Sequence, residues 1–300
     1  MATTTGPQLE QLFKDLQKIP GWFWPIDMFL FSGINELQQV GKCTGDILEI
    51  GAYKGKSAIL LGQCLAAHEE LVVCDTFESD AIQEQNLAEN QTYYANLQRQ
   101  TFEHNFHRFH SHPPQIYECS STALSDHIGL AKRFRLIHID GSHLFEIVQQ
   151  DIKLSKDILK DNGIVIFDDY RSSHTPGVAA ALWDAVLHQE LHPFCLSPLK
   201  MYAYWGGSPP FEAKALTDWL RTYEAFQIEE SIVSNNRMLI VDLPSSASAK
   251  YEQNWRQRTL WSLRSLVKPC APCRKWFNVI GLRSNARSYL TFPDKHIHNQ

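Results

Sequence analysis

The sequence predicts an α/β fold, in which a doubly wound and mostly parallel sheet of seven strands has helices on both faces. Short apolar segments rich in Val, Ile and Leu alternate with segments of helical length from about residue 46 to residue 205. Strands that alternate with helices in this way form parallel sheets with right-handed crossovers. Acidic residues directly follow several of the apolar segments. They should therefore gather at one edge of the sheet, where open α/β sheets bind ligands.

The elements follow in order along the chain. Two helices, at 9–19 and 26–40, precede the first strand, and we expect residues 1–40 to form a helical N-terminal cap. The parallel strands are predicted at 46–50, 71–74, 115–118, 134–139 and 164–167. Helices are predicted at 58–68, 122–128, 144–159 and 177–191. Residues 194–205 should supply a closing antiparallel pair, which completes the seven strands.

The chain divides into the cap, a central α/β domain at 41–205 and a C-terminal extension at 206–300. The extension contains a helix candidate at 211–226 and a strand candidate within 231–243. Beyond a Ser- and Ala-rich linker, the tail is basic, contains three tryptophans and includes the pair Cys270 and Cys273. The tail could dock to an acidic partner, but packing on the core or on a second subunit is the simpler interpretation. We therefore expect a possible homo-oligomer through the terminal extensions.

The composition is that of an ordinary globular protein, with 300 residues, 44% apolar and 20% charged. The net charge of -5 argues against a nucleic-acid-binding surface. The number of cysteines, 7, is odd, which fits reduced thiols better than a disulfide framework. No secretory signal is visible, and the longest apolar stretch, at 22–31, is interrupted by Asp27 and too short for a membrane span. These features predict a cytoplasmic location.

The first chemical motif is DILEIGAYKGKS, in which Gly51 and Gly55 stand where a strand turns into a helix. Glycine permits a tight turn and the close approach of a ligand, and the helix N-terminus adds backbone N–H donors. Asp75 ends the second strand, where an acid typically accepts hydrogen bonds from the ribose hydroxyls of an adenosine ligand. Each feature also has a plainer explanation, an ordinary glycine turn and a helix N-cap. Together they favour a nucleoside ligand.

The second motif joins two neighbouring strands. One ends in Asp140, with His143 three residues later, and the next ends in the pair Asp168 and Asp169. Three acids and a histidine in one crevice suit a divalent cation and a general base, since hard cations prefer oxygen ligands. Adjacent carboxylates in a crevice repel one another unless a cation compensates them. The alternative is that Asp140 caps the next helix and His143 is a polar residue of its first turn.

The succession ExGxxxGxS, an acid after the second strand, IDGSH and FDDY resembles class I S-adenosylmethionine (SAM)-dependent methyltransferases, which have a Rossmann-like fold. Within that class it is similar to the metal-dependent branch that contains macrocin O-methyltransferase-like sugar methyltransferases and cephalosporin hydroxylase-like proteins. The resemblance covers roughly residues 41–204. It implies that SAM is bound by Glu49, Gly51, Ala52, Gly55, Ser57, Asp75, Ser120 and Asp140. It also implies that Asp140, Asp168 and Asp169 hold Mg²⁺ and that His143 is the base.

These observations predict a SAM- and Mg²⁺-dependent O-methyltransferase that acts on a hydroxyl of a small molecule, a sugar or polyol part of a natural product. A hydroxyl is a poor nucleophile at neutral pH, so the enzyme must deprotonate it and align it with the methyl group. One alternative is a metal-independent or N-directed methyltransferase. Others are an NAD-dependent dehydrogenase, disfavoured by the missing third glycine and the extra acids, and a non-catalytic adenosine-binding module.

Overall fold

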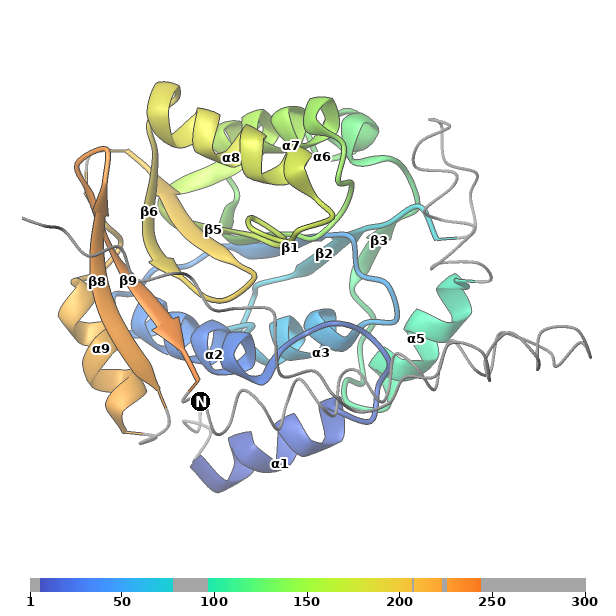
Figure 1. The fold of residues 1–300 in the computed structure, drawn as a ribbon. Helices are drawn as coiled ribbons and strands as arrows, with labels where there is room; N and C mark the ends of the chain where they lie inside the picture. The colour runs from blue at the N-terminus through green and yellow to red at the C-terminus, as the bar shows by residue number, and fades with distance from the viewer. Residues whose placement is uncertain (1–5, 78–96, 207, 223–225, 244–300) are drawn as a thin grey trace, which may run out of the picture. The chain divides into compact units, whose positions relative to one another are not determined.

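The computed structural model describes residues 6–77, 97–206, 208–222 and 226–243 (Figure 1). Within these ranges, nine strands form one sheet in the order β3-β2-β1-β4-β5-β7-β6-β9-β8. The predicted doubly wound α/β class is confirmed. The basic tail, the Cys270–Cys273 motif and most of the polar segment that follows Phe77 lie outside the described residues.

Strands β1 (Asp46–Ile50), β2 (Leu71–Cys74), β3 (Gln115–Tyr117), β4 (Phe134–Ile139) and β5 (Leu159–Phe167) are parallel. The first, second and fourth have the predicted bounds. The predicted closing antiparallel pair is confirmed as β6 (Leu191–Leu196) and β7 (Met201–Trp205), with β7 antiparallel to β5. The short turn between β6 and β7 places the start of β7 beside the end of β5, at the edge where the acidic residues lie.

The predicted number of seven strands is wrong, because the described sheet has nine. The additional strands are β8 (Gln227–Val233) and β9 (Asn236–Asp242), which form an antiparallel hairpin. Strand β9 runs parallel to β6, so the sheet continues beyond residue 205. Ser234 and Asn235 join the two strands with φ values of 48° and 64°, as the tight turn of a hairpin requires. The strand candidate within 231–243 corresponds to β9. Strand β8 went unrecognised because it is an edge strand with few buried side chains.

Helices cover both faces of the sheet. Figure 1 shows α6 (Leu124–Ile128), α7 (Phe145–Ile158) and α8 (Pro176–His188) on one face, with α2 (Pro25–Val40) and α3 (Lys56–Gln63) on the other. The remaining helices are α1 (Gly6–Leu16), α5 (Arg99–His107), the short 3₁₀ helix η1 (Ser121–Ala123) and α9 (Ala213–Arg221). Among the described residues, no helix combines the length and the hydropathy that a bilayer crossing requires.

Helix α9 packs on α2 through a glycine contact. A side chain at Gly33 would lie 2.6 Å from the ring of Trp219, so only glycine allows this approach. The indole N–H of Trp219 donates a hydrogen bond to Glu36, at 2.9 Å. The segment after residue 205 is thus joined to the N-terminal helices as well as to the sheet.

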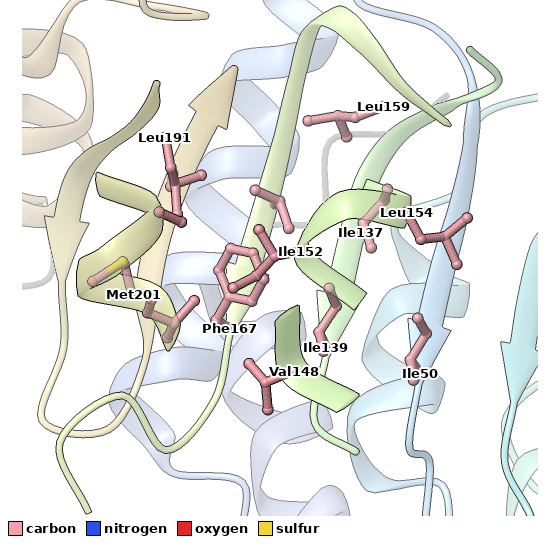
Figure 2. Close-up of a cluster of buried hydrophobic side chains, with 14 of the residues drawn as sticks. Ile50, Ile137, Ile139, Val148, Ile152, Leu154, Leu159, Phe167, Leu191 and Met201 are labelled. Atoms are coloured by element: carbon pink, nitrogen blue, oxygen red, sulfur yellow. The ribbon is translucent and has the colours of Figure 1, made fainter. Parts of the chain in front are cut away.

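The core between the sheet and α7 is apolar, as Figure 2 shows. Ile137 and Ile139 of β4 and Phe167 of β5 pack with Val148 and Ile152 of α7, and all five are buried. Each such side chain contributes about 1.5–3 kcal/mol when it leaves water. This packing fixes the ends of β4 and β5, from which the candidate site residues extend.

Two further buried ionisable groups are Arg135 of β4 and Asp151 of α7. Arg135, near the start of β4, is fully buried and donates two hydrogen bonds to the carboxylate of Glu69, at 2.9 and 2.8 Å. It also donates to Gln38 of α2, which ties this helix to the sheet. Asp151 of α7 is 1% exposed, and burial raises its pKa to about 7, although the Ser121 hydroxyl opposes the shift.

Candidate functional site

Backbone hydrogen bonds align the carboxyl ends of the parallel strands. The N–H of Asp140, just beyond β4, donates to Ile50 O of β1 at 2.7 Å. The N–H of Asp168, just beyond β5, donates to Ile139 O at 2.9 Å. The loops that follow β1, β4 and β5 therefore start at one level. The predicted meeting of Asp140 and Asp168 at one edge is confirmed.

The turn after β1 requires its glycines. Gly51 has a φ of +81°, and a Cβ there would lie 1.9 Å from the carbonyl oxygen of Asp140. Gly55, with a φ of +88°, immediately precedes α3. The predicted close approach at this turn is thus a contact with the loop after β4. Ser57 lies buried in the first turn of α3.

The carboxylate of Asp75 holds this glycine turn. It accepts hydrogen bonds from the backbone N–H groups of Ala52 at 2.7 Å, Tyr53 at 2.9 Å and Phe77 at 2.8 Å. Burial is the largest influence on the pKa of Asp75 and raises it, while these three donors lower it. A carboxylate offers about four acceptor positions, so one remains for a ligand hydroxyl.

Ser120 follows β3 and caps the short helix η1, where its hydroxyl lies 2.9 Å from that of Thr122. It lies beyond the end of β3, two strands from β1 in the sheet.

Glu49 is fully buried, and its Oε1 lies 2.8 Å from Nδ1 of His138, also fully buried. Lys200 Nζ lies 3.0 Å from Nε2 of the same ring. Because an ammonium only donates, Nε2 must accept and Nδ1–H must donate to Glu49. Burial and the nearby Lys200 charge hold the pKa of His138 well below its usual value, and burial raises that of Glu49 to about 8. Glu49 therefore belongs to an internal network behind the turn.

Lys200 lies between the two strand-end acids. Its Nζ is 2.8 Å from Asp168 Oδ2 and 3.8 Å from Asp140 Oδ2. Burial lowers the pKa of Lys200, but Asp168, Asp140 and Asp27 outweigh it and raise that pKa above its usual value. The pKa of Asp140 lies well above its usual value, through burial and the charge of Asp168.

Asp169 has different partners from Asp168. It has a φ of 59°, which is uncommon for a residue with a side chain and is typical of functional sites. Its Oδ2 lies 3.1 Å from His143 Nε2, and its Oδ1 accepts a hydrogen bond from the Ser172 hydroxyl. Burial alone would raise the pKa of Asp169, but His143 and Ser172 lower it below its usual value. His143 and Asp169 thus form a carboxylate–imidazole dyad.

A cavity opens between these groups. It is lined by the loop after β4 and the ends of β4 and β5, and Val148 and Val178 form its apolar wall. The polar residues that line it are Asp140, Ser142, His143, Asp168 and Asp169. All four residues predicted to carry the chemistry therefore border one cavity.

The three predicted Mg²⁺ ligands do not fit one ion as they are placed. Mg²⁺ requires oxygen ligands at about 2.0–2.1 Å in octahedral geometry. Asp168 and Asp140 instead flank a lysine ammonium, while Asp169 faces His143. Among the described residues, the group that brings three potential ligand atoms within 4.8 Å of one another is His143, Asp169 and His174. The site residues thus form two groups. Asp140 and Asp168 lie around the Lys200 ammonium, and Asp169 lies beside the His143 imidazole.

Sequence reasoning did not identify Lys200, His138 or the buried pair Asp27 and Tyr202. The Tyr202 hydroxyl donates to Asp27 Oδ1 at 2.7 Å. The sequence does contain a signal for Asp27 and Lys200. Asp27 interrupts an apolar run, and Lys200 directly precedes one. A charged residue in such a run is costly to bury unless it is paired.

One family model matches the central part of the chain. Residues 48–170 match the family model described as a methyltransferase domain, which confirms the predicted resemblance over this segment. No curated protein matches the chain.

Several solved structures are similar at low sequence identity. The O-methyltransferase NovP is 16% identical over 58% of this chain and 81% of its own, with a TM-score of 0.44. CalS11, a TDP-rhamnose 3'-O-methyltransferase of calicheamicin biosynthesis, is 16% identical over 68% and 96%, with a TM-score of 0.42. TomG from Streptomyces achromogenes, an O-methyltransferase solved with SAM, is 15% identical over 66% and 89%, with a TM-score of 0.44.

Proposed function

Since residues 48–170 match a methyltransferase domain, we propose that this protein is a SAM-dependent O-methyltransferase that acts on a hydroxyl of a small molecule. The observation that carries the proposal is the His143–Asp169 dyad at the cavity beside the glycine turn. We further propose that the acceptor hydroxyl belongs to a sugar or polyol part of a natural product.

The glycine turn and Asp75 form the proposed cofactor site. Gly51 allows the loop after β4 to lie directly against the turn, and Asp75 fixes the backbone of Ala52 and Tyr53. The remaining acceptor position of Asp75 suits a ribose hydroxyl. Bound SAM would supply an electrophilic methyl group on its sulfonium. Glu49 is also proposed to belong to the cofactor site: His138 holds its Oε1, while its buried Oε2 has no hydrogen-bond partner among the described residues.

His143 is the proposed general base. Asp169 orients the ring through Nε2, and the imidazole takes the proton of the acceptor hydroxyl. Asp169 then stabilises the imidazolium that forms, as its lowered pKa indicates that it remains ionised. Val148 and Val178 give the cavity an apolar wall that limits access of water to this proton transfer.

The experiment combines SAM binding by calorimetry with a mass-spectrometric screen of hydroxylated small molecules and labelled SAM. His143→Ala should lower kcat by about 10²- to 10⁴-fold and leave the Kd for SAM nearly unchanged. Asp75→Ala should mainly raise the Kd for SAM, because it removes both the ribose acceptor and the support of the turn. His188→Ala is the matched control, since His188 pairs with Asp184 on the exposed surface of α8.

Equal loss of binding and turnover in both variants would contradict these roles. Full activity of His143→Ala would remove the proposed base. Binding of NAD without binding of SAM would favour the dehydrogenase alternative, and SAM binding without transfer to any acceptor would favour the non-catalytic module.

A further inference from the structure

Lys200 is held rigidly in the turn between β6 and β7. Its backbone N–H donates to the Ser197 hydroxyl at 2.9 Å, and its carbonyl accepts from the Ser197 N–H at 2.9 Å. The side chain is 1% exposed, and its ammonium lies 5.7 Å from the centre of the Phe23 ring. A long, flexible side chain pays an entropic cost to be fixed in this way, which strong partners must offset.

Two of the three donors of the ammonium have a hydrogen-bond partner among the described residues. Two N–H groups point to Asp168 Oδ2 at 2.8 Å and to His138 Nε2 at 3.0 Å, and Asp140 Oδ2 lies 3.8 Å away. The His138 ring accepts from the ammonium through Nε2 and donates through Nδ1, so it adds no competing charge. Among the described residues, the Lys200 ammonium is the cation paired with both strand-end carboxylates.

The ammonium reduces the repulsion between Asp168 and Asp140, two acids that follow neighbouring strands and lie close together. A divalent ion bound by Asp168 and Asp140 would lie within a few ångströms of a buried ammonium and would be repelled by it. It would also have to displace the 2.8 Å contact between Lys200 and Asp168. The lysine and the divalent ion are alternative occupants of one place.

We propose that the Lys200 ammonium is the built-in cation of this site, which pairs with Asp168 and Asp140 in place of a divalent metal ion. Lys200 is a positioning residue: it orients Asp140, which borders both the cavity and the glycine turn. Its part in methyl transfer rests on the proposed function, whereas its exclusion of a divalent ion does not.

The first test measures Mn²⁺ binding to the full-length protein by calorimetry and electron paramagnetic resonance, without SAM. The wild type should either bind no Mn²⁺ or bind it with an affinity that Asp168→Asn leaves unchanged. The second result would correspond to an ion at His143, Asp169 and His174, away from Lys200. Stoichiometric binding by the wild type that Asp168→Asn abolishes would overturn the proposal. Because SAM is absent, a failure of the proposed function does not affect this result.

The second test uses Lys200→Met, which removes the charge and keeps an unbranched side chain. This variant should bind Mn²⁺ at least roughly tenfold more tightly than the wild type, because the repulsion is gone while both carboxylates remain. The control is Lys156→Met, since Lys156 is an exposed lysine near Glu190 and should leave Mn²⁺ binding unchanged. Mn²⁺ binding by Lys200→Met that is no tighter than that of the wild type would contradict the proposal. If Lys200→Met does not fold, the wild-type and Asp168→Asn measurements decide alone.

A third readout follows if the protein methylates an acceptor. Excess EDTA should leave turnover by the wild type unchanged. It should lower turnover by Lys200→Met, and added Mn²⁺ should restore that turnover. Loss of wild-type turnover in EDTA, restored by Mg²⁺ and dependent on Asp168, would overturn the proposal.

Discussion

The substitution Asp151→Asn should stabilise the protein in a pH-dependent way. Asp151 lies on α7 against the sheet, is 1% exposed and has its pKa raised to about 7 from its usual value of 3.8. Burial is the main cause, and the Ser121 hydroxyl compensates it only in part. Asparagine has nearly the same shape and carries no charge, so it removes the cost of a buried carboxylate.

The magnitude follows from the two pKa values. Between pH 3.8 and about 7, the folded chain holds a proton on Asp151 that the unfolded chain has released. The free energy of unfolding therefore falls as pH rises through this window and stays lower above it. A shift of this size corresponds to at most about 4 kcal/mol. Since a buried amide without full hydrogen bonding costs about 1–3 kcal/mol, the net gain at pH 8 should be about 1–3 kcal/mol.

The assay is urea unfolding of the wild type and Asp151→Asn at pH 8 and at pH 4.5. The variant should be more stable at pH 8 and should lose most of this advantage at pH 4.5, where the wild-type carboxyl is protonated. Asp157→Asn on the same helix is the matched control, because Asp157 is partly exposed. An equal gain at both pH values, or a loss of stability at pH 8, would refute the reasoning.

Two further substitutions test the turn and the buried ion pair. Gly51→Ala should weaken SAM binding by roughly tenfold or more in calorimetry, because its Cβ would displace the Asp140 carbonyl, 1.9 Å away. Unchanged affinity for SAM would mean that the turn does not contact the cofactor. Glu69→Ala should lower the free energy of unfolding by about 3–5 kcal/mol, since it leaves Arg135 buried without its carboxylate. Glu70→Ala, which removes an exposed partner, should cost less than about 1 kcal/mol in the same denaturation experiment, and equal effects would contradict this difference.

Much of the fold could be predicted because its signals are local. Short, mostly apolar runs gave β1, β2 and β4 with their observed bounds, since buried parallel strands are largely apolar. Strand β8 has exposed residues along most of its length, so its sequence lacks that signal. Its place in the sheet depends on pairing with β9, and through β9 on β6, which no local pattern encodes.

The sequence by itself determined which acids stand at the strand ends, because parallel strands that follow one another along the chain align their carboxyl ends. Asp140, His143, Asp168 and Asp169 were identified on this basis, and they do border one cavity. It also determined the glycine turn, because a strand followed directly by a helix leaves few residues that can make the bend.

Only the tertiary structure decided what each acid faces. Asp168 and Asp169 are adjacent in the chain, yet one meets Lys200 and the other His143, because the backbone at Asp169 adopts a positive φ. Lys200 arrives from the turn before β7, and its contact with Asp168 depends on the pairing of β5 with β7. Lys200 comes from a distant segment, so the spacing of the acids, from which Mg²⁺ was predicted, contains no sign that this side chain contacts Asp168.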